Sequence, residues 1–325
     1  MRIAVAIHDL PVWTIPPSEV GRLAQLLPAD EIVDAREPAE RRAAFADAEV
    51  LFATKISVDE FAIAKRVRWM HSSAVGVDPL LRGPVIESPV LVTNSRGVHS
   101  DAIAEHAISL VLGLRRQLHT AIQRQVAREW AQVELHGPVT PPLSETRLLV
   151  IGLGSIGSRV AVLAAGLGMR VTGIRRRVTE PLPMGVSEVA GLERLVPELG
   201  AADVVVLALP RTEDTRALIG SAELAAMKPS GLLVNVARGK LVDETALVEA
   251  LERGQIAGAG LDAFQQEPLP SDHPLWRAKN ALITPHTASF AGDYWRPVVD
   301  LFLDNLARFK RGEPLLNVVD KTRGY

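Results

Sequence analysis

The chain of 325 residues contains no cysteine, which removes disulfide bonds, thiolate metal ligands and a cysteine nucleophile together. It also has no excess of either charge, because 36 basic residues stand against 38 acidic ones and the net charge is −2. This balance provides no global field that would attract nucleic acid or an anionic membrane. Its eight histidines show no convincing metal spacing. We therefore expect a cytoplasmic protein that binds no nucleic acid, membrane or metal.

A long uninterrupted hydrophobic run is also missing. The apolar stretch at residues 3–7 is too short for the core of a signal peptide. The most apolar segment, residues 148–169, contains Arg159 and five glycines. At the centre of a membrane span, Arg159 would cost about 2.5–3.5 kcal/mol. A buried strand, a tight glycine turn and a helix explain this segment better than a membrane helix.

The chain instead alternates short apolar runs with amphipathic segments, which is typical of βαβ units and parallel sheets. The alternation stops in the proline-rich connection at residues 136–147 and then restarts. We predict an α/β fold of two Rossmann-like or flavodoxin-like parallel-sheet domains with a cleft between them. Residues 1–97, completed by 287–325, are expected to form the substrate-binding (catalytic) domain. Residues 98–286 are expected to form the dinucleotide-binding Rossmann domain.

The individual elements follow from the period of the apolar residues. Helical spacing predicts one long helix from Asp101 to about Arg128. Further helices are expected near Ser155 and at residues 18–27, 39–46, 58–66, 221–227, 244–253 and 291–311. Strands are expected within residues 2–7, 31–35, 49–54, 68–73, 147–152, 169–174, 203–209, 232–237, 257–264 and 281–286.

Gly152, Gly154 and Gly157 form a G-x-G-x-x-G motif between a predicted strand and a predicted helix. One glycine permits the tight turn, the next lets the backbone approach a pyrophosphate, and the third lets the helix pack on the strand. The backbone amides of Ser155 and Ile156 would then point at a diphosphate at the helix N-terminus. The motif predicts dinucleotide binding; the alternative is a glycine-rich turn that binds nothing.

Three arginines, Arg175 to Arg177, follow the next predicted strand. An acid about 20 residues past such a glycine turn usually binds the adenosine ribose hydroxyls. Arg175 and Arg176 would instead clamp a 2′-phosphate with charge-assisted hydrogen bonds. We therefore expect NADP as the preferred cofactor, with NAD also usable. A solvated turn is the alternative, which Arg177 fits best, and no wider basic face supports a nucleic-acid patch.

Three sequence blocks occur in order in the C-terminal two-thirds: "NVARGKLVD", "LDAFQQEPLPSDHPLW" and "ITPHTA". Together they resemble the D-isomer-specific 2-hydroxyacid dehydrogenases, in particular those of the glyoxylate/hydroxypyruvate reductase type. The resemblance implies that Arg238, Glu267 and His286 are the catalytic residues. Each also follows a predicted strand, where open α/β sheets place their ligand crevice.

The chemistry of 2-keto acid reduction suits these three side chains. His286 would donate a proton to the developing alkoxide of the bound substrate. Glu267 would orient the imidazole and favour its protonated form. Arg238 would bind the substrate carboxylate and polarise the keto oxygen. We expect NAD(P)H-dependent reduction of small 2-keto acids such as glyoxylate or hydroxypyruvate to D-2-hydroxy acids, or the reverse oxidation.

The resemblance also implies roles outside the catalytic three. The backbone amides of Val75 and Gly76 would hold the substrate carboxylate, Asp262 would meet the nicotinamide carboxamide, and Pro210 and Thr215 would lie beside the cofactor riboses. Family members commonly dimerise through the nucleotide domain, so a homodimer is expected. The alternative function is a nucleotide-sensing, corepressor-like interaction protein of the same fold.

Overall fold

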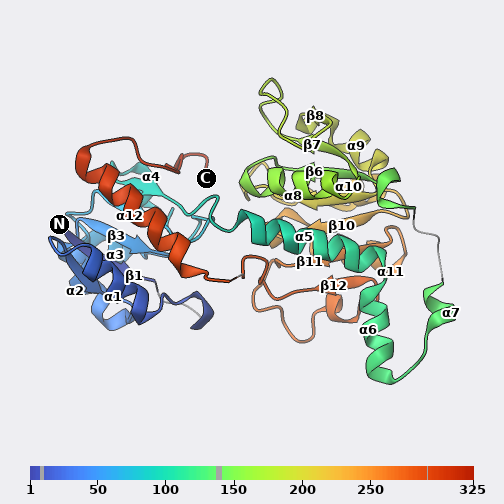
Figure 1. Cartoon of the computed structure of the whole chain (residues 1–325), viewed down its shortest axis with the longest axis horizontal. Coiled ribbons are helices and arrows are strands. Elements are labelled where there is room, and N and C mark those ends of the chain that lie inside the picture. Colours follow the sequence, from blue (N-terminus) through green and yellow to red (C-terminus); the bar gives the residue numbers. More distant parts are fainter. Residues whose placement is uncertain (8–10, 137–140, 291) are drawn as a thin grey trace. The chain divides into compact units, whose positions relative to one another are not determined.

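The computed structural model describes residues 1–7, 11–136, 141–290 and 292–325 (Figure 1). The chain divides into two compact units. One comprises Met1–Val98 and Ala291–Tyr325, and the other comprises His99–Phe290. Each unit is built on a sheet whose neighbouring strands are all parallel. The predicted α/β fold with two Rossmann-like parallel sheets is therefore confirmed.

The first unit contains a five-stranded sheet in the order β2-β1-β3-β4-β5. This is the 2-1-3-4-5 order of flavodoxin-like sheets. In β1, Ile3 and Val5 belong to one buried cluster, whereas Ala4 and Ala6 belong to another, so both faces of the sheet are buried. The strands are β1 (Arg2–Ala6), β2 (Glu31–Asp34), β3 (Val50–Ala53), β4 (Trp69–His71) and β5 (Leu91–Thr93).

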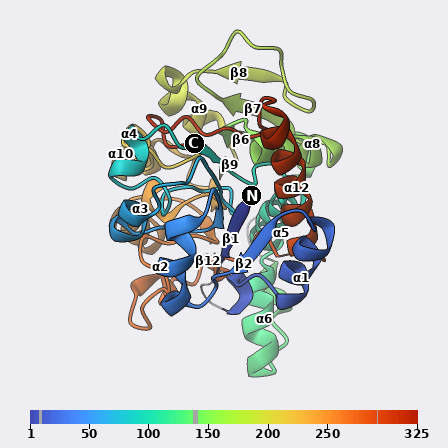
Figure 2. The ribbon, with the colours of Figure 1, turned by 90° about the vertical axis from the view of Figure 1, so that its left-hand side faces the viewer.

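Helices cover each face of this sheet. Two helices pack on the face of Ile3, namely α1 (Pro17–Leu26) and α12 (Trp295–Arg311) (Figure 2). The opposite face is covered by α2 (Pro38–Asp47), α3 (Val58–Ile63) and α4 (Pro84–Glu87).

The C-terminal helix α12 completes the first unit through its aromatic face. Phe302 stacks on Phe52 of β3, with ring centroids 4.3 Å apart, and on Trp69 of β4, at 5.2 Å. The helix was expected from residue 291, which lies outside the described residues, but it begins at Trp295. Gly292 has a φ of 46°, a conformation that a helix does not contain.

The second unit contains a seven-stranded sheet in the order β12-β11-β10-β9-β6-β7-β8. The chain runs outward from β6 to β8 and then returns to β9 on the other side of β6. Ligands of open α/β sheets bind at the carboxyl ends of the strands, beside such a reversal. The strands are β6 (Arg147–Ile151), β7 (Arg170–Ile174), β8 (Glu188–Ala190), β9 (Val204–Leu207), β10 (Leu232–Asn235), β11 (Gly258–Leu261) and β12 (Ala281–Ile283).

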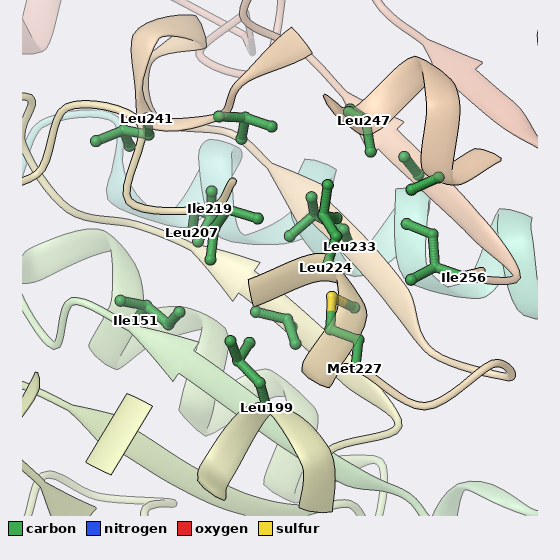
Figure 3. Close-up of a cluster of buried hydrophobic side chains, with 14 of the residues drawn as sticks. Ile151, Leu199, Leu207, Ile219, Leu224, Met227, Leu233, Leu241, Leu247 and Ile256 are labelled. Carbon is green, nitrogen blue, oxygen red and sulfur yellow. The ribbon is translucent and has the colours of Figure 1, made fainter. Parts of the chain in front are cut away.

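This larger sheet also has two covered faces. One carries α5 (Ser100–Arg115) and α8 (Ser155–Gly166). The other carries α9 (Leu195–Ala201), α10 (Ser221–Ala226) and α11 (Glu244–Glu252), whose apolar side chains meet those of β6, β9 and β10 in the cluster of Figure 3. Asp243 caps α11 as its position suggests, accepting hydrogen bonds from the amides of Thr245 and Ala246.

The prediction of a single long helix from Asp101 to about Arg128 is wrong, because the segment forms two helices. Helix α5 ends at Arg115, Gln117 adopts a left-handed conformation with a φ of 52°, and α6 (Leu118–Ala127) follows. Helix α5 is buried along its length in the second unit, whereas α6 has no buried residue. Because no core contact extends the packing of α5 into α6, the helical period alone did not reveal the break.

Several short elements have no counterpart among the predicted segments. The strands β5 and β8 have three residues each and lie at the edges of their sheets. Helix α9 contains a proline and a glycine, which weaken the helical signal. Residues 148–169 form most of β6, the glycine turn and α8, as predicted. No helix among the described residues is long and apolar enough to cross a membrane.

Candidate active site

The three predicted catalytic residues lie just past three neighbouring strands. Arg238 follows β10, Glu267 follows β11 and His286 follows β12. Because β10, β11 and β12 are adjacent and parallel, their carboxyl ends lie at one edge of the sheet. The fold thus brings the three segments together.

The imidazole of His286 and the carboxylate of Glu267 form a hydrogen-bonded pair. Nδ1 of His286 lies 2.7 Å from Oε2 of Glu267. The other carboxylate oxygen, Oε1, accepts a hydrogen bond from the amide of Phe264 at 2.9 Å. When Nδ1 donates to Glu267, Nε2 is the nitrogen that can exchange a proton with a substrate. Both side chains remain accessible, with 40% of His286 and 34% of Glu267 exposed.

The surroundings of Glu267 keep it ionised. Burial raises the pKa of Glu267, but the hydrogen bonds from His286 and from the Phe264 amide lower it more, and the positive charge of Arg238 adds to the lowering. The net result is a pKa below the ordinary value for a glutamate. Glu267 is therefore a carboxylate at neutral pH and a hydrogen-bond acceptor for the imidazole.

A buried aspartate holds the segment that contains His286. Asp262 accepts hydrogen bonds from the hydroxyl of Thr284 at 2.7 Å, from the amide of Thr287 at 2.9 Å and from the amide of Ala288 at 3.0 Å. It thereby fixes the chain on both sides of His286, whose φ of 54° is unfavourable for a non-glycine residue. This bracing role was not predicted from the sequence. Contact of Asp262 with a nicotinamide stays a prediction.

A second buried side chain shapes the loop of Arg238. Asn235 accepts a hydrogen bond from the amide of Ala237 at 3.0 Å and donates one to the carbonyl of Arg238 at 2.9 Å. A Cβ atom on Gly239 would lie 1.9 Å from the carbonyl carbon of Phe264, so only glycine fits there. The Arg238 loop therefore packs directly on the loop whose amide binds Glu267. No role for Asn235 or Gly239 was predicted from the sequence, although both belong to the "NVARG" block.

The glycine turn has the geometry that a dinucleotide requires. Gly152 has a φ of 97°, and a Cβ on Gly157 would lie 1.8 Å from the carbonyl oxygen of Gly152. A Cβ on Gly154, at the N-cap of α8, would meet nothing within 4 Å. The backbone is thus open where the amides of Ser155 and Ile156 begin the helix. These residues fit a pyrophosphate at the helix N-terminus.

The predicted phosphate clamp lies at the carboxyl end of β7, the strand next to β6. Arg175 donates from Nη2 to the carbonyl of Glu180 and, at 3.0 Å, to that of Pro181. Its Nε is buried and has no hydrogen-bond partner among the described residues. The side chain of Arg176 is exposed. The arginines are therefore placed beside the glycine turn, but part of Arg175 is already bound to its own loop.

The loop after β9 contains the other predicted cofactor residues. Thr215 is buried, and its hydroxyl donates to the carbonyl of Pro210 at 2.9 Å while accepting from the amide of Thr212 at 2.7 Å. Thr215 braces this loop, and Pro210 is exposed at its start. Contacts of either residue with a ribose remain predictions.

Val75 and Gly76 belong to the first unit, in the loop after β4. Asn94 donates a hydrogen bond to the carbonyl of Val75 at 2.8 Å, and this bond holds the loop in place. Neither amide of Val75 and Gly76 donates a hydrogen bond to another described residue, so both can bind an anion. His71, at the end of β4, is buried, and burial lowers its pKa to about 3, so it is a neutral core residue. No group of three potential ligands among the described residues could hold a metal ion.

The strand order, the open glycine turn and the imidazole–carboxylate pair define a dinucleotide-dependent oxidoreductase. Residues 108–288 match the family model for the D-isomer specific 2-hydroxyacid dehydrogenase NAD binding domain. A glyoxylate reductase from Korarchaeum cryptofilum is 36% identical over 276 residues, covering 83% of this chain and 81% of that protein. The chain belongs to the D-isomer-specific 2-hydroxyacid dehydrogenase family, as its sequence blocks indicate.

Solved structures agree with this assignment. A D-isomer specific 2-hydroxyacid dehydrogenase from Xanthobacter autotrophicus, in complex with NADPH and MES, is 32% identical, with a TM-score of 0.83 and 99% of each chain covered. An NADPH-dependent glyoxylate/hydroxypyruvate reductase from Sinorhizobium meliloti, in complex with NADP and sulfate, is 26% identical, with a TM-score of 0.86 and 100% of each chain covered. The protein is an NAD(P)-dependent D-2-hydroxyacid dehydrogenase that acts on 2-keto acids and their hydroxy acids.

Proposed function

We propose that this dehydrogenase reduces glyoxylate and hydroxypyruvate with NADPH. The observation that supports the reaction best is the 2.7 Å pair of His286 and Glu267 at the strand edge shared with Arg238. The glyoxylate reductases among its relatives support the choice of substrate.

Each residue of the edge has one task in this reaction. The bound nicotinamide supplies the hydride that reduces the keto carbon. Arg238 binds the substrate carboxylate through its planar fork. His286 gives the proton on Nε2 to the keto oxygen as negative charge develops there. Glu267 stays ionised, holds the imidazole through Nδ1 and stabilises its positive charge.

The preference for NADPH rests on the arginines after β7. A 2′-phosphate beside the glycine turn would meet Arg175 and Arg176 at the carboxyl end of the adjacent strand. The neighbours from Xanthobacter autotrophicus and Sinorhizobium meliloti bind NADPH and NADP. In this proposal Nε of Arg175, which lacks a partner among the described residues, gains one from the phosphate.

A panel of keto acids tests the proposed reaction. Loss of absorbance at the reduced-nicotinamide band would be followed with glyoxylate, hydroxypyruvate, pyruvate and 2-oxobutyrate, each with NADPH and with NADH. We expect the highest kcat/KM for glyoxylate or hydroxypyruvate with NADPH. Higher kcat/KM with pyruvate would refute the substrate, and no turnover with any keto acid would favour a nucleotide-sensing function.

We also propose that the protein forms a homodimer through a surface on α6 and α7 (Gln132–Leu135). The large apolar residues of α6, Leu118, Ile122 and Val126, are four positions apart, so they share one helix face. Trp130 and Val133, which follow α6, are 89% and 91% exposed. An exposed apolar surface of this kind marks an interaction site. The surface consists of Leu118, Ile122, Val126, Trp130 and Val133.

Sedimentation velocity of Trp130→Glu combined with Val133→Glu tests this dimer. We expect the variant to sediment as a monomer, because two charges would be buried without partners in the interface. The control is Leu182→Glu, which adds a charge at an exposed leucine outside this surface. A variant that stays as associated as the wild type would show that the copies do not meet there.

A further inference from the structure

Helix α5 presents an imidazole to the segment that contains His286. Nε2 of His106 lies 2.9 Å from Oγ1 of Thr284 and 3.5 Å from Oδ1 of Asp262. The hydroxyl of Thr284 donates its single proton to Asp262, at 2.7 Å. Its oxygen therefore accepts from His106, which means that Nε2 of His106 carries a proton and donates it. A directed chain of hydrogen bonds thus runs from His106 through Thr284 to Asp262.

Two glycines of β11 bring α5 close enough for this contact. A Cβ atom on Gly260 would lie 3.0 Å from Cβ of Leu110. A Cβ atom on Gly258 would lie 3.4 Å from Cδ2 of Leu114. Both leucines share one helix face with His106, at four and eight positions after it. Because the helix runs antiparallel to the strand, His106 lies one turn beyond Leu110, at the carboxyl end of β11.

The chain of hydrogen bonds ends on the backbone around His286. Asp262 is buried and accepts from the amides of Thr287 and Ala288, which directly follow that histidine. On the other side, the amide of His286 donates to the carbonyl of Thr284 at 3.0 Å. The φ of 54° at His286 persists only where the surrounding bonds hold it. These bonds therefore fix the direction in which the imidazole points.

We propose that His106 is a positioning residue for the proton donor: its N–H group turns the Thr284 hydroxyl towards Asp262 and thereby keeps the imidazole of His286 against Glu267. His106 touches neither the substrate nor the reacting atoms in this account. Its Nε2 carries a proton in this neutral form and in the imidazolium form alike, so the contact requires no charge. The kinetic consequence rests on the proposed function, whereas the arrangement of His286 in the free enzyme does not.

Two substitutions of His106 separate the N–H group from the bulk of the ring. His106→Phe removes the donor and keeps an aromatic ring, whereas His106→Gln keeps an N–H donor. We expect kcat for glyoxylate reduction to fall about tenfold in His106→Phe, because proton transfer requires a well-placed donor. In His106→Gln it should return to within about threefold of the wild type. An equal loss in both variants would mean that the site does not require the N–H group.

A double-mutant cycle tests whether His106 acts through Thr284. Thr284→Val keeps the shape of threonine but lacks the hydroxyl that joins His106 to Asp262. If the two side chains belong to one chain of bonds, combining His106→Phe with Thr284→Val should lower kcat no further than the more damaging single variant. Losses that multiply would contradict this route. The matched control is His119→Phe, at a half-buried histidine of α6 that hydrogen-bonds to the backbone of Gly113, and it should leave kcat unchanged.

Nitrogen NMR of the free enzyme tests the arrangement without turnover. The nitrogen shifts of a neutral imidazole show which atom carries the proton, and the His286 ring is assigned by its loss in His286→Ala. We expect the proton on Nδ1 in the wild type and in His106→Gln, and a mixture of the two tautomers in His106→Phe. An unchanged tautomer in folded His106→Phe, or an equal change in His119→Phe, would overturn the inference. Absence of keto acid reduction alongside the expected tautomers would instead refute the proposed function alone.

Discussion

The carboxyl ends of β10 to β12 and the carboxyl end of β7 hold their charged side chains in different ways. At the first edge, Asn235 and Asp262 are each 1% exposed and fix the loops of Arg238 and His286 from inside. At the second, Arg176 and its neighbour Arg177 are exposed, and Arg177 pairs with Glu180 of the same loop at 3.1 Å. The difference teaches that the proposed proton transfer has a preorganised setting, while the proposed choice of NADPH would depend on more exposed cations.

The largest expected effect is at the carboxyl ends of β10 to β12, where His286 lies. In His286→Ala, kcat for glyoxylate reduction should fall by about 10²–10⁴, because the proton donor to the keto oxygen is lost. The dissociation constant for NADPH, measured by fluorescence, should not change, since the glycine turn is intact. The control is His136→Ala, at an exposed histidine. Near wild-type turnover in His286→Ala would show that His286 is not the proton donor.

Glu267→Gln should lower kcat about a hundredfold, because the uncharged amide cannot stabilise the imidazolium that donates the proton. The pH dependence has a definite sign. The pKa of Glu267 lies below the ordinary value of about 4.3, so the wild-type carboxylate persists as the pH falls through that value and is lost only below it. The pH profile of kcat should show this acid limb in the wild type and lack it in the variant. An identical limb in both would assign it to another group.

Arg238→Lys keeps the charge but loses the planar fork. We expect kcat/KM for glyoxylate to fall about thirtyfold, which corresponds to ~2 kcal/mol, mainly through a higher KM. Steady-state kinetics with an aldehyde that lacks a carboxylate provide the control. If that aldehyde lost as much as glyoxylate, Arg238 would not be the carboxylate-binding residue.

The smallest effect is expected at the carboxyl end of β7, where Arg175 and Arg176 lie. Replacing Arg175 with Asp and Arg176 with Ser should lower kcat/KM for NADPH at least about tenfold and reverse the preference over NADH. Kinetics with both cofactors measure this ratio. Arg177→Ser, on the same loop, should leave the ratio unchanged. A native enzyme that already prefers NADH would mean that the arginines form only a solvated turn.

Much of the fold follows from local pattern. The apolar runs that became β6, β9 and β10 are buried on both faces, so their signal was strong. The end strands β5 and β8 were missed because three residues carry little periodicity. The helix break at Gln117 was missed because it lies where contacts with the core end. The helical period of the sequence does not predict that position.

The site was predictable in the same uneven way. Arg238 and His286 come within a few residues of an apolar run, so their placement at strand ends could be foreseen. The hydrogen bonds of Asp262 and the contact of His106 with Thr284 join residues far apart in the chain, and only the tertiary fold brings them together. Arg175 and Glu180 are close in the chain, but their contact depends on the path of the loop between them, which the sequence pattern does not predict.

The most direct measurement is the configuration and yield of the product that the wild-type enzyme makes from hydroxypyruvate and NADPH. Chiral chromatography would identify the glycerate, and absorbance would count the NADPH consumed. The account predicts D-glycerate, one molecule for each NADPH oxidised. Formation of L-glycerate, or loss of NADPH without glycerate, would contradict it.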